Sequence, residues 1–536
     1  MLPSRKAFAG LACVLGLAVV TPGWAKPKAA PAAASALPAG ARPQEVDQLA
    51  QRILQTFQVP GMSVAIVKDG TVLFAKGYGV RAVGKPEKVD ADTLFGIGSN
   101  TKAFTVAALA VLVDEGKLRW DDKVTDLIPG FRLYDPYVTR ELTVRDLLSH
   151  RSGLGLGSGD LMLFPPSDFT RAEIIHNLRY LPPASSFRAK YAYDNLLYIV
   201  AGDLIPRLTG ISWEQFVQTR ILDRLGTGCA ATLTLTAGNR DVAAPHVVID
   251  GKLTEVPPDP STAYDPAGSI QCNASGMAAW AKLQLAAGRM PDGSALFSEA
   301  RHKEMWTPQT IVPVPDTGGL THTRFRNYGL AWFLEDYDGA ERVTHTGGLI
   351  GMVSYVSLLP EQHVGVVVLT NQQSGAAMSA MMQTLLDAFL HQAPRDWVGV
   401  WQKRNAEQMQ KGDDADRAAE AAIKAAGGRA FLPLEAYVGT YHDPWRGDAT
   451  VAKQGDKLRL AFSRTKGMQG DMQVMKGNVF AVRWDDKSLK ADALVNFRTG
   501  MDGAVSGMTM APLSPTVDFS FDFQDLDFTR TARTAP

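Results

Sequence analysis

Ser99 and Lys102 are the two residues of this chain whose types and spacing best suit catalysis. They open and close the sequence Ser-Asn-Thr-Lys, and residues three positions apart lie on one face of a helix. The following run, 103–113, is apolar at nearly every position. Because an ammonium group is destabilised in apolar surroundings, we expect the pKa of Lys102 to be lowered. Such a lysine can activate a serine hydroxyl as a nucleophile.

The same spacing occurs a second time, at Ser463 and Lys466. That copy lies in a polar stretch with no apolar helix behind it, which indicates a solvated turn. Ser99, by contrast, begins a predicted helix, where backbone N–H groups form the positive end of the helix dipole. We therefore predict Ser99 as the nucleophile, Lys102 as its catalytic partner, and the Ser99 N–H as a donor to an oxyanion.

Tyr193 and Asn195 form a second candidate pair, at the start of another predicted helix. A phenol beside a cationic lysine has its pKa lowered, since the charge favours phenolate. We therefore predict that Tyr193 is catalytic and relays the serine proton. Asn195 offers both a donor and an acceptor, and we predict that it binds a substrate amide.

A third group, His345-Thr346-Gly347-Gly348, follows a β-type run. Glycine allows a ligand backbone to lie close to a strand. We predict that His345, Thr346 and Gly347 bind substrate, and that the Gly348 N–H is the second donor of the oxyanion hole.

These three motifs resemble, in order and rough spacing, those of the serine β-lactamase/penicillin-binding superfamily. The resemblance is to its class C β-lactamase-like branch, which also holds D-alanyl-D-alanine carboxypeptidases, D-aminopeptidases and esterases. Residues 147–154, Leu-Leu-Ser-His-Arg-Ser-Gly-Leu, are similar to the family's LLSHTSGL segment, with Arg151 in place of threonine. The resemblance covers about residues 45–395 and implies a serine hydrolase that forms a covalent acyl-enzyme on Ser99.

Two departures from the family pattern bear on the substrate. Asp194 stands where a small residue is usual, and its charge would disfavour anionic substrates. His345 stands where class C β-lactamases carry lysine, and a histidine with an ordinary pKa is mostly neutral at pH 7. We therefore expect a D-amino-acid peptidase, carboxypeptidase or esterase acting on a small molecule or short peptide, peptidoglycan-derived or containing D-amino acids. The alternatives are a β-lactamase proper, or a β-lactam-binding sensor that is acylated without turnover.

Periodicity places these motifs in an α/β (α+β) domain over residues 44–400. We expect an antiparallel sheet flanked by helices, with strands from both chain ends completing the sheet. The resemblance implies a β-lactamase/transpeptidase-like fold, in which a mostly helical subdomain accompanies this sheet. A strong hairpin signal, Asp69-Gly70, lies between two early β-rich runs. The main predicted helices are Gln44–Phe57, Ser99–Glu115 and Ala376–Leu390, and the strands are Met62–Val67, Val72–Tyr78, Tyr328–Leu334, Arg342–His345, Val353–Leu359 and Val364–Leu369.

The C-terminal part has a different composition. Residues 401–432 are alanine-rich and charged, which suits either a helical or a flexible linker. Residues 433–536 contain only strand-like runs, among them Lys457–Phe462 and Val517–Phe523. The resemblance implies a small all-β, lipocalin-like barrel domain here, of the kind often appended to such hydrolases.

Residues 1–25 have the features of a secretory signal peptide. Arg5 and Lys6 precede a short apolar run, Ala7–Val20, and small residues surround Ala25. The run is shorter than the ~20 residues that span a bilayer. Residues 26–43 are rich in alanine and proline and suit an extended linker. We therefore expect a periplasmic or secreted protein with no stable membrane insertion after cleavage.

Cys229 and Cys272 would then reside in an oxidising compartment. A disulfide between them would stabilise the fold by about 4 kcal/mol on the loop-entropy relation. Two buried thiols are the alternative, since the sequence does not show whether the two Cα atoms approach each other.

The charge balance excludes other classes of function. Lys+Arg and Asp+Glu both number 55, whereas nucleic-acid-binding proteins carry a basic excess. The 9 histidines form no His-Glu-x-x-His sequence and no close pair with cysteine. We therefore expect no nucleic-acid partner, no metal and no other cofactor.

Overall fold

The structure is a computed structural model that describes residues 37–233, 241–425 and 428–531. The predicted signal peptide, 1–25, and most of the predicted linker, 26–43, lie outside these ranges. Residues from Leu37 onward belong to one compact unit. No helix in the described ranges is both long enough and apolar enough to cross a membrane.

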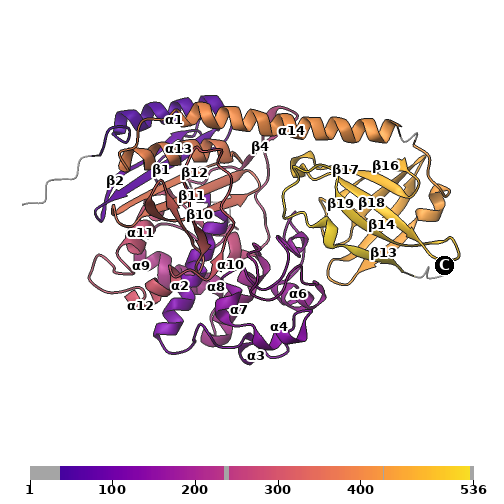
Figure 1. The fold of residues 1–536 in the computed structure, drawn as a ribbon, viewed down its shortest axis with the longest axis horizontal. Helices are drawn as coiled ribbons and strands as arrows, with labels where there is room; N and C mark the ends of the chain where they lie inside the picture. The colour runs from indigo at the N-terminus through magenta and orange to yellow at the C-terminus, as the bar shows by residue number, and fades with distance from the viewer. Residues whose placement is uncertain (1–36, 234–240, 426–427, 532–536) are drawn as a thin grey trace, which may run out of the picture. The chain divides into compact units, whose positions relative to one another are not determined.

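An eight-stranded antiparallel sheet organises the first domain (Figure 1). The early hairpin pairs with a strand from the far end of the domain, so both chain ends complete the sheet as predicted. Asp69 (φ 50°) and Gly70 (φ 72°) form its left-handed turn. In spatial order the strands are β2 (Thr71–Gly79), β1 (Gly61–Lys68), β12 (Val364–Thr370), β11 (Met352–Leu359), β10 (Ala340–Leu349), β9 (Phe333–Tyr337), β8 (Arg326–Tyr328) and β7 (Thr310–Ile311).

Helices cover both faces of this sheet. Side chains alternate along a strand, and so Val64 and Ile66 of β1 belong to one apolar cluster while Ala65 and Val67 belong to the other. The first cluster includes α1 (Pro43–Phe57) and α13 (Gly375–Phe389), against which α14 (Trp397–Ala425) packs. The second includes α2 (Thr101–Asp114) and α11 (Ala274–Leu285) (Figure 1).

A mostly helical subdomain extends the second cluster. Thr143 caps one of its short helices, where its side chain accepts a hydrogen bond from the Asp146 N–H, as residues of this type do at helix starts. The helices are α3 (Val124–Leu127), α4 (Pro136–Glu141), α5 (Val144–Leu147), α6 (Arg171–Asn177), α7 (Leu196–Thr209), α8 (Trp213–Val217), α9 (Asp223–Leu225), α10 (Asp265–Gly268) and α12 (Glu299–Met305). Two small strand pairs accompany them: β3 (Phe95–Gly96) with β6 (Gln271–Cys272), and β4 (His246–Ile249) with β5 (Lys252–Glu255).

The C-terminal domain is a closed barrel of eight antiparallel strands, which confirms the predicted all-β barrel. Closure pairs its first strand with its last and removes free sheet edges. Residues 401–425 of the preceding charged segment are helical within α14, so the helical alternative holds for that part of the predicted linker. The strands are β13 (Gly439–Asp443), β14 (Gly447–Gln454), β15 (Lys457–Phe462), β16 (Gln469–Lys476), β17 (Val479–Trp484), β18 (Ala493–Thr499), β19 (Val505–Pro512) and β20 (Asp527–Arg530).

Two predicted strands were wrong. Tyr328–Leu334 is not one strand, because β8 ends at Tyr328, β9 begins at Phe333, and the turn between them has Ala331 at φ 65°. This turn is apolar because it is buried. Val517–Phe523 is a loop that leads into a 3-10 turn, Phe523–Asp525. Its alternating phenylalanines reflect tertiary packing, since Phe521 and Phe523 are buried.

Candidate active site

Ser99 lies in a 3-10 turn, Gly98–Asn100, that leads directly into α2. Gly98 has φ 52°, a left-handed conformation that glycine adopts without strain. A Cβ atom at this position would lie 2.7 Å from the Gly348 nitrogen, so β10 passes very close to the turn. The Ser99 hydroxyl is thereby placed at the start of a helix and beside the end of a strand.

Hydrogen bonds fix this turn to the central sheet. The Asn100 side-chain amide donates to Ser354 Oγ at 2.7 Å. Ser354 Oγ in turn donates to the Ile97 carbonyl at 2.6 Å. Both partners of Ser354 are buried, so β11 holds the residues on either side of Ser99.

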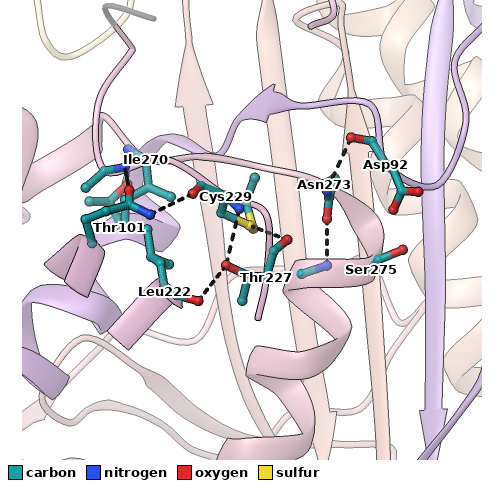
Figure 2. Close-up of a disulfide and its surroundings, with 12 residues drawn as sticks. Asp92, Thr101, Leu222, Thr227, Cys229, Ile270, Asn273 and Ser275 are labelled. Carbon is teal, nitrogen blue, oxygen red and sulfur yellow. Dashed lines mark hydrogen bonds between the residues drawn. A yellow bond between two sulfur atoms is a disulfide. The ribbon is translucent and has the colours of Figure 1, made fainter. Parts of the chain in front are cut away.

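A disulfide joins Cys229 to Cys272, which resolves the question that the sequence left open. Figure 2 shows the bridge together with Thr101 of α2, whose Oγ1 accepts a hydrogen bond from the Ile270 N–H at 3.1 Å. Because Cys272 belongs to β6, which pairs with β3 just before the Ser99 turn, the bridge braces the segment that packs behind the nucleophile.

Lys102 is fully buried, and its ammonium group donates three hydrogen bonds. The acceptors are Ser99 Oγ at 3.0 Å, Asn195 Oδ1 at 2.7 Å and the Ala267 carbonyl at 2.9 Å. Burial lowers the pKa of Lys102 to about 7, although the carboxyl groups of Asp160 and Asp194 oppose the shift. The predicted direction is correct, and at neutral pH this lysine is present in both protonated and neutral forms.

Tyr193 also packs at this centre, with its ring centroid 4.9 Å from Lys102 Nζ. The prediction of a lowered phenol pKa was wrong: burial raises the pKa of Tyr193 well above its ordinary value, and a hydrogen bond to Ser99 opposes this only in part. Removing the phenolate from water costs more than this hydrogen bond returns. Tyr193 is therefore a protonated phenol that can donate a proton.

Asn195 connects Lys102 to a carboxyl group that the sequence did not reveal. Its Oδ1 accepts from Lys102, and its Nδ2 donates to Asp160 Oδ2 at 2.8 Å. Both ends of the amide thus have protein partners, whereas we had predicted that they would face a substrate amide. The amide orients the lysine.

The negative charge expected at Asp194 is weaker than the sequence implied. The side chain is buried and accepts a hydrogen bond from the Leu197 N–H at 3.2 Å, at the start of α7. Burial raises the pKa of Asp194 to about 7. About half of these carboxyl groups are consequently neutral at pH 7.

His345 is buried on β10 and is neutral at pH 7. Its Nδ1 lies 2.6 Å from the Thr346 carbonyl, which can only accept a hydrogen bond, and its Nε2 lies 3.1 Å from the Tyr328 hydroxyl. Burial, reinforced by the charge of Lys102, lowers the pKa of His345 to about 3. The histidine therefore carries even less charge than its ordinary pKa predicted.

A cavity of about 470 Å³ joins most of the predicted residues. Ligand sites of this size accept small molecules or short peptides. Gly347 does not line it; a Cβ atom there would lie 1.8 Å from the Ile97 carbonyl, so this glycine permits close packing of β10 on the Ser99 turn. The predicted site residues that do line the cavity are Ser99, Tyr193, Asn195, His345, Thr346 and Gly348.

Comparisons with known proteins agree with this geometry. Residues 46–389 match the family described as Beta-lactamase, and residues 424–530 match a domain of unknown function, DUF3471. The chain belongs to the beta-lactamase family. It is 30% identical over 489 residues to Unguisins hydrolase ungD' of Aspergillus campestris (strain IBT 28561), covering 86% of this chain and 88% of that protein.

Other known proteins are similar over shorter stretches or in fold. Penicillin-binding protein 4 of Amycolatopsis lactamdurans is 30% identical over 321 residues, covering 58% of this chain and 81% of that protein. The octameric penicillin-binding protein homologue from Pyrococcus abyssi shares the fold, with TM-score 0.57 and 22% identity, over 91% of this chain and 99% of that one. Family and named relatives together make this protein a serine hydrolase.

Three features of this beta-lactamase-family site had no sequence signal. Asp160 begins a short 3-10 turn, Asp160–Met162, and Ser520 and Asp522 lie in the segment that was wrongly predicted as a strand. No motif marks them, and the alternation around Ser520 and Asp522 predicted a strand instead of these contacts, because their partners are distant in the chain. The second Ser-x-x-Lys copy, Ser463 to Lys466, begins and ends with exposed residues, as predicted.

Proposed function

We propose that this protein is an exported serine hydrolase that cleaves an amide or ester bond through a covalent acyl-enzyme on Ser99. The observation that carries the proposal is the contact between Lys102 Nζ and Ser99 Oγ, made by a lysine whose pKa is lowered to about 7. A general base with a pKa near the working pH is the most effective one. Export is supported by the sequence of residues 1–25 and by the disulfide, which persists in oxidising compartments.

In the acylation step, neutral Lys102 takes the proton of Ser99 Oγ while this oxygen attacks the substrate carbonyl carbon. The resulting oxyanion accepts hydrogen bonds from the backbone N–H groups of Ser99 and Gly348, both of which border the cavity. When the tetrahedral intermediate collapses, the bond to the leaving group breaks. Tyr193 donates its phenol proton to that group and recovers a proton from the Lys102 ammonium.

Deacylation reverses these roles, with water in place of the leaving group. Neutral Lys102 takes a proton from water as the water oxygen attacks the acyl carbon. The bond from this carbon to Ser99 Oγ then breaks, and Ser99 regains its proton from Lys102. Every proton that leaves a group returns, so the enzyme ends each cycle as it began.

A D-amino-acid peptidase, a carboxypeptidase or an esterase fits this site better than a β-lactamase proper. His345 supplies no positive charge at neutral pH. Arg326 of β8 lines the cavity and forms an ion pair at 2.9 Å with Glu335, which also pairs with Arg342. On β10 itself, Arg342 is buried and paired with Glu335, so this strand offers no free cation to a substrate carboxylate. The relative named Unguisins hydrolase favours turnover over stable binding.

The test is a burst experiment on the purified protein with a p-nitrophenyl ester, a D-amino-acid p-nitroanilide and nitrocefin. We expect many equivalents of nitrophenol or nitroaniline per chain, and little nitrocefin hydrolysis. Release that stops at one equivalent would instead identify a protein that is acylated without turnover. Efficient hydrolysis of nitrocefin alone would identify a β-lactamase.

A further inference from the structure

We propose that the barrel domain completes the substrate cleft, and that Phe519 determines which side chains the cleft accepts. This inference rests on the proposed function, because it assigns a substrate class to the same site. Phe519 belongs to residues 513–526, which connect β19 to β20. The segment is far from Ser99 in the chain, yet both residues line the same cavity.

Phe519 forms part of the wall of that cavity. Its ring centroid is 6.1 Å from the Tyr193 ring, and the two planes meet at 81°, an edge-to-face arrangement that aromatic pairs favour. Phe519 is 41% exposed, so part of this residue remains open to a ligand. The Phe519 carbonyl would be 2.6 Å from a Cβ atom placed on Gly157, so the two backbones are in close contact.

Buried hydrogen bonds hold this segment in place. The Asp522 carboxyl group accepts from the Gly159 N–H at 2.6 Å and from the Leu161 N–H at 3.0 Å. Ser158 Oγ donates to Asp525 Oδ2 at 2.9 Å. Because Asp522 is fully buried, these bonds are shielded from water and position Phe519 firmly.

The same segment reaches the catalytic lysine through one carboxyl group. Ser520 Oγ donates to Asp160 Oδ2 at 3.0 Å, and the same oxygen accepts from Asn195 Nδ2 at 2.8 Å. Asn195 in turn accepts from Lys102 at 2.7 Å. A continuous path of hydrogen bonds therefore links the barrel domain to the residue that activates Ser99.

The other walls of the cavity define the class of ligand. They are largely apolar or aromatic, and such walls take up apolar groups by excluding water from both surfaces. We therefore infer that the substrate carries a bulky apolar or aromatic side chain close to the bond that is cleaved. The side chains that make these walls are Leu163, Phe164, Tyr264, Phe333, Leu349 and Phe521.

The test compares Phe519→Ala with the wild type on two p-nitrophenyl esters that share a leaving group, the acetate and the 3-phenylpropionate. The readout is the rate of the first equivalent of nitrophenol, which reports acylation of Ser99 with or without turnover. We expect the preference for the phenylpropionate to fall at least tenfold in Phe519→Ala. Phe519→Trp, which narrows the cavity, should shift the preference again while retaining an aromatic wall.

Phe431→Ala is the matched control, since this phenylalanine of the barrel domain is 76% exposed and does not line the cavity. Its preference should equal that of the wild type. If neither Phe519 variant changes the preference by more than twofold while the wild type is acylated, the inference is overturned and the proposed function stands. If the wild type is acylated by neither ester, both proposals are overturned.

Discussion

At the scale of single residues, the site depends on a lysine that the fold removes from water. Lys102 of α2 is fully buried, and its ammonium group donates to three acceptors while lying near the Tyr193 and Tyr198 rings. Its lowered pKa makes the neutral amine available near pH 7. Tyr193 is partly buried and His345 is buried at the same centre, and their removal from water keeps both side chains uncharged. The centre therefore contains one base, one phenolic proton donor and one neutral imidazole.

The first prediction concerns the nucleophile. Ser99→Ala should abolish turnover and labelling by a fluorophosphonate probe, because it removes the oxygen that forms the acyl bond. Ser463→Ala should change neither property, since the second Ser-x-x-Lys serine is exposed on the barrel domain. Gel fluorescence after labelling and steady-state kinetics measure both. Stoichiometric labelling of the Ser99 variant within the cavity would contradict the assignment.

The second prediction concerns pH. Only neutral Lys102 can take the serine proton, and its fraction increases as pH rises through the pKa of about 7. The kcat/KM for a neutral p-nitrophenyl ester should therefore rise about tenfold per pH unit below 6 and level off above 8. His345, with a pKa of about 3, takes no part in this change.

His345→Gln provides the control for that pH profile. This substitution can change the absolute rate, but the midpoint of the kcat/KM profile against pH should stay near 7 if the titrating group is Lys102. A midpoint near 6.5 that disappears in His345→Gln would show that the histidine titrates in this range, and would refute its neutral assignment.

At the scale of elements, the geometry depends on how closely β10 approaches the turn before α2. Gly347 and Gly348 are neighbours on β10 but meet different surroundings. A Cβ atom on Gly347 would lie 1.8 Å from the Ile97 carbonyl, whereas one on Gly348 would meet nothing within 4 Å. Neither glycine has a left-handed φ. The contact with the turn is therefore the reason for glycine at position 347.

The third prediction follows from this contrast. Gly347→Ala must displace either β10 or the Ser99 turn, and overpacking of this kind costs about 1–3 kcal/mol. We expect a lower free energy of unfolding and a large loss of kcat. Gly348→Ala should keep the wild-type free energy of unfolding within about 0.5 kcal/mol. Urea unfolding followed by tryptophan fluorescence measures both variants, and equal destabilisation of the two would contradict the argument.

At the scale of the whole molecule, a buried carboxyl group of the barrel domain supports a loop of the hydrolase domain. Asp522 accepts from two backbone N–H groups, those of Gly159 and Leu161, on either side of Asp160. Burial raises the pKa of Asp522 to about 8, with Asp525 adding to the shift. The carboxyl group is thus mostly neutral at pH 7 and still accepts hydrogen bonds.

The fourth prediction removes this support. Asp522→Ala leaves two buried N–H groups without acceptors, at a cost of about 1–3 kcal/mol each. We expect the free energy of unfolding to fall by about 2–4 kcal/mol, and kcat to fall because Asp160 no longer orients Asn195. Asp502→Ala, in an exposed turn of the barrel domain, should change neither. Urea titration and steady-state kinetics measure both variants. A wild-type free energy of unfolding and a wild-type kcat in Asp522→Ala would contradict the supporting role of Asp522.

Local pattern was sufficient for much of this protein. The pair Ser99 and Lys102, the start of α2, the early hairpin and the order of late strands all follow from residues a few positions apart. The family followed from three short motifs and their order. Helical and strand periodicities report the neighbours of a residue along the chain, and these neighbours lie on the same element.

Only the tertiary structure decided the charge states of the site residues and the part of the cavity wall that the barrel domain supplies. The pKa of Tyr193 was predicted to be lowered and is raised, because desolvation depends on every group packed around the phenol. Val517–Phe523 alternates like a strand, but Phe519 lines the cavity and Asp522 is held by residues of another domain. Ser520 and Asp160 are 360 residues apart and share a hydrogen bond. Periodicity reports no contact at such a separation, since it is the packing of whole domains that brings these residues together.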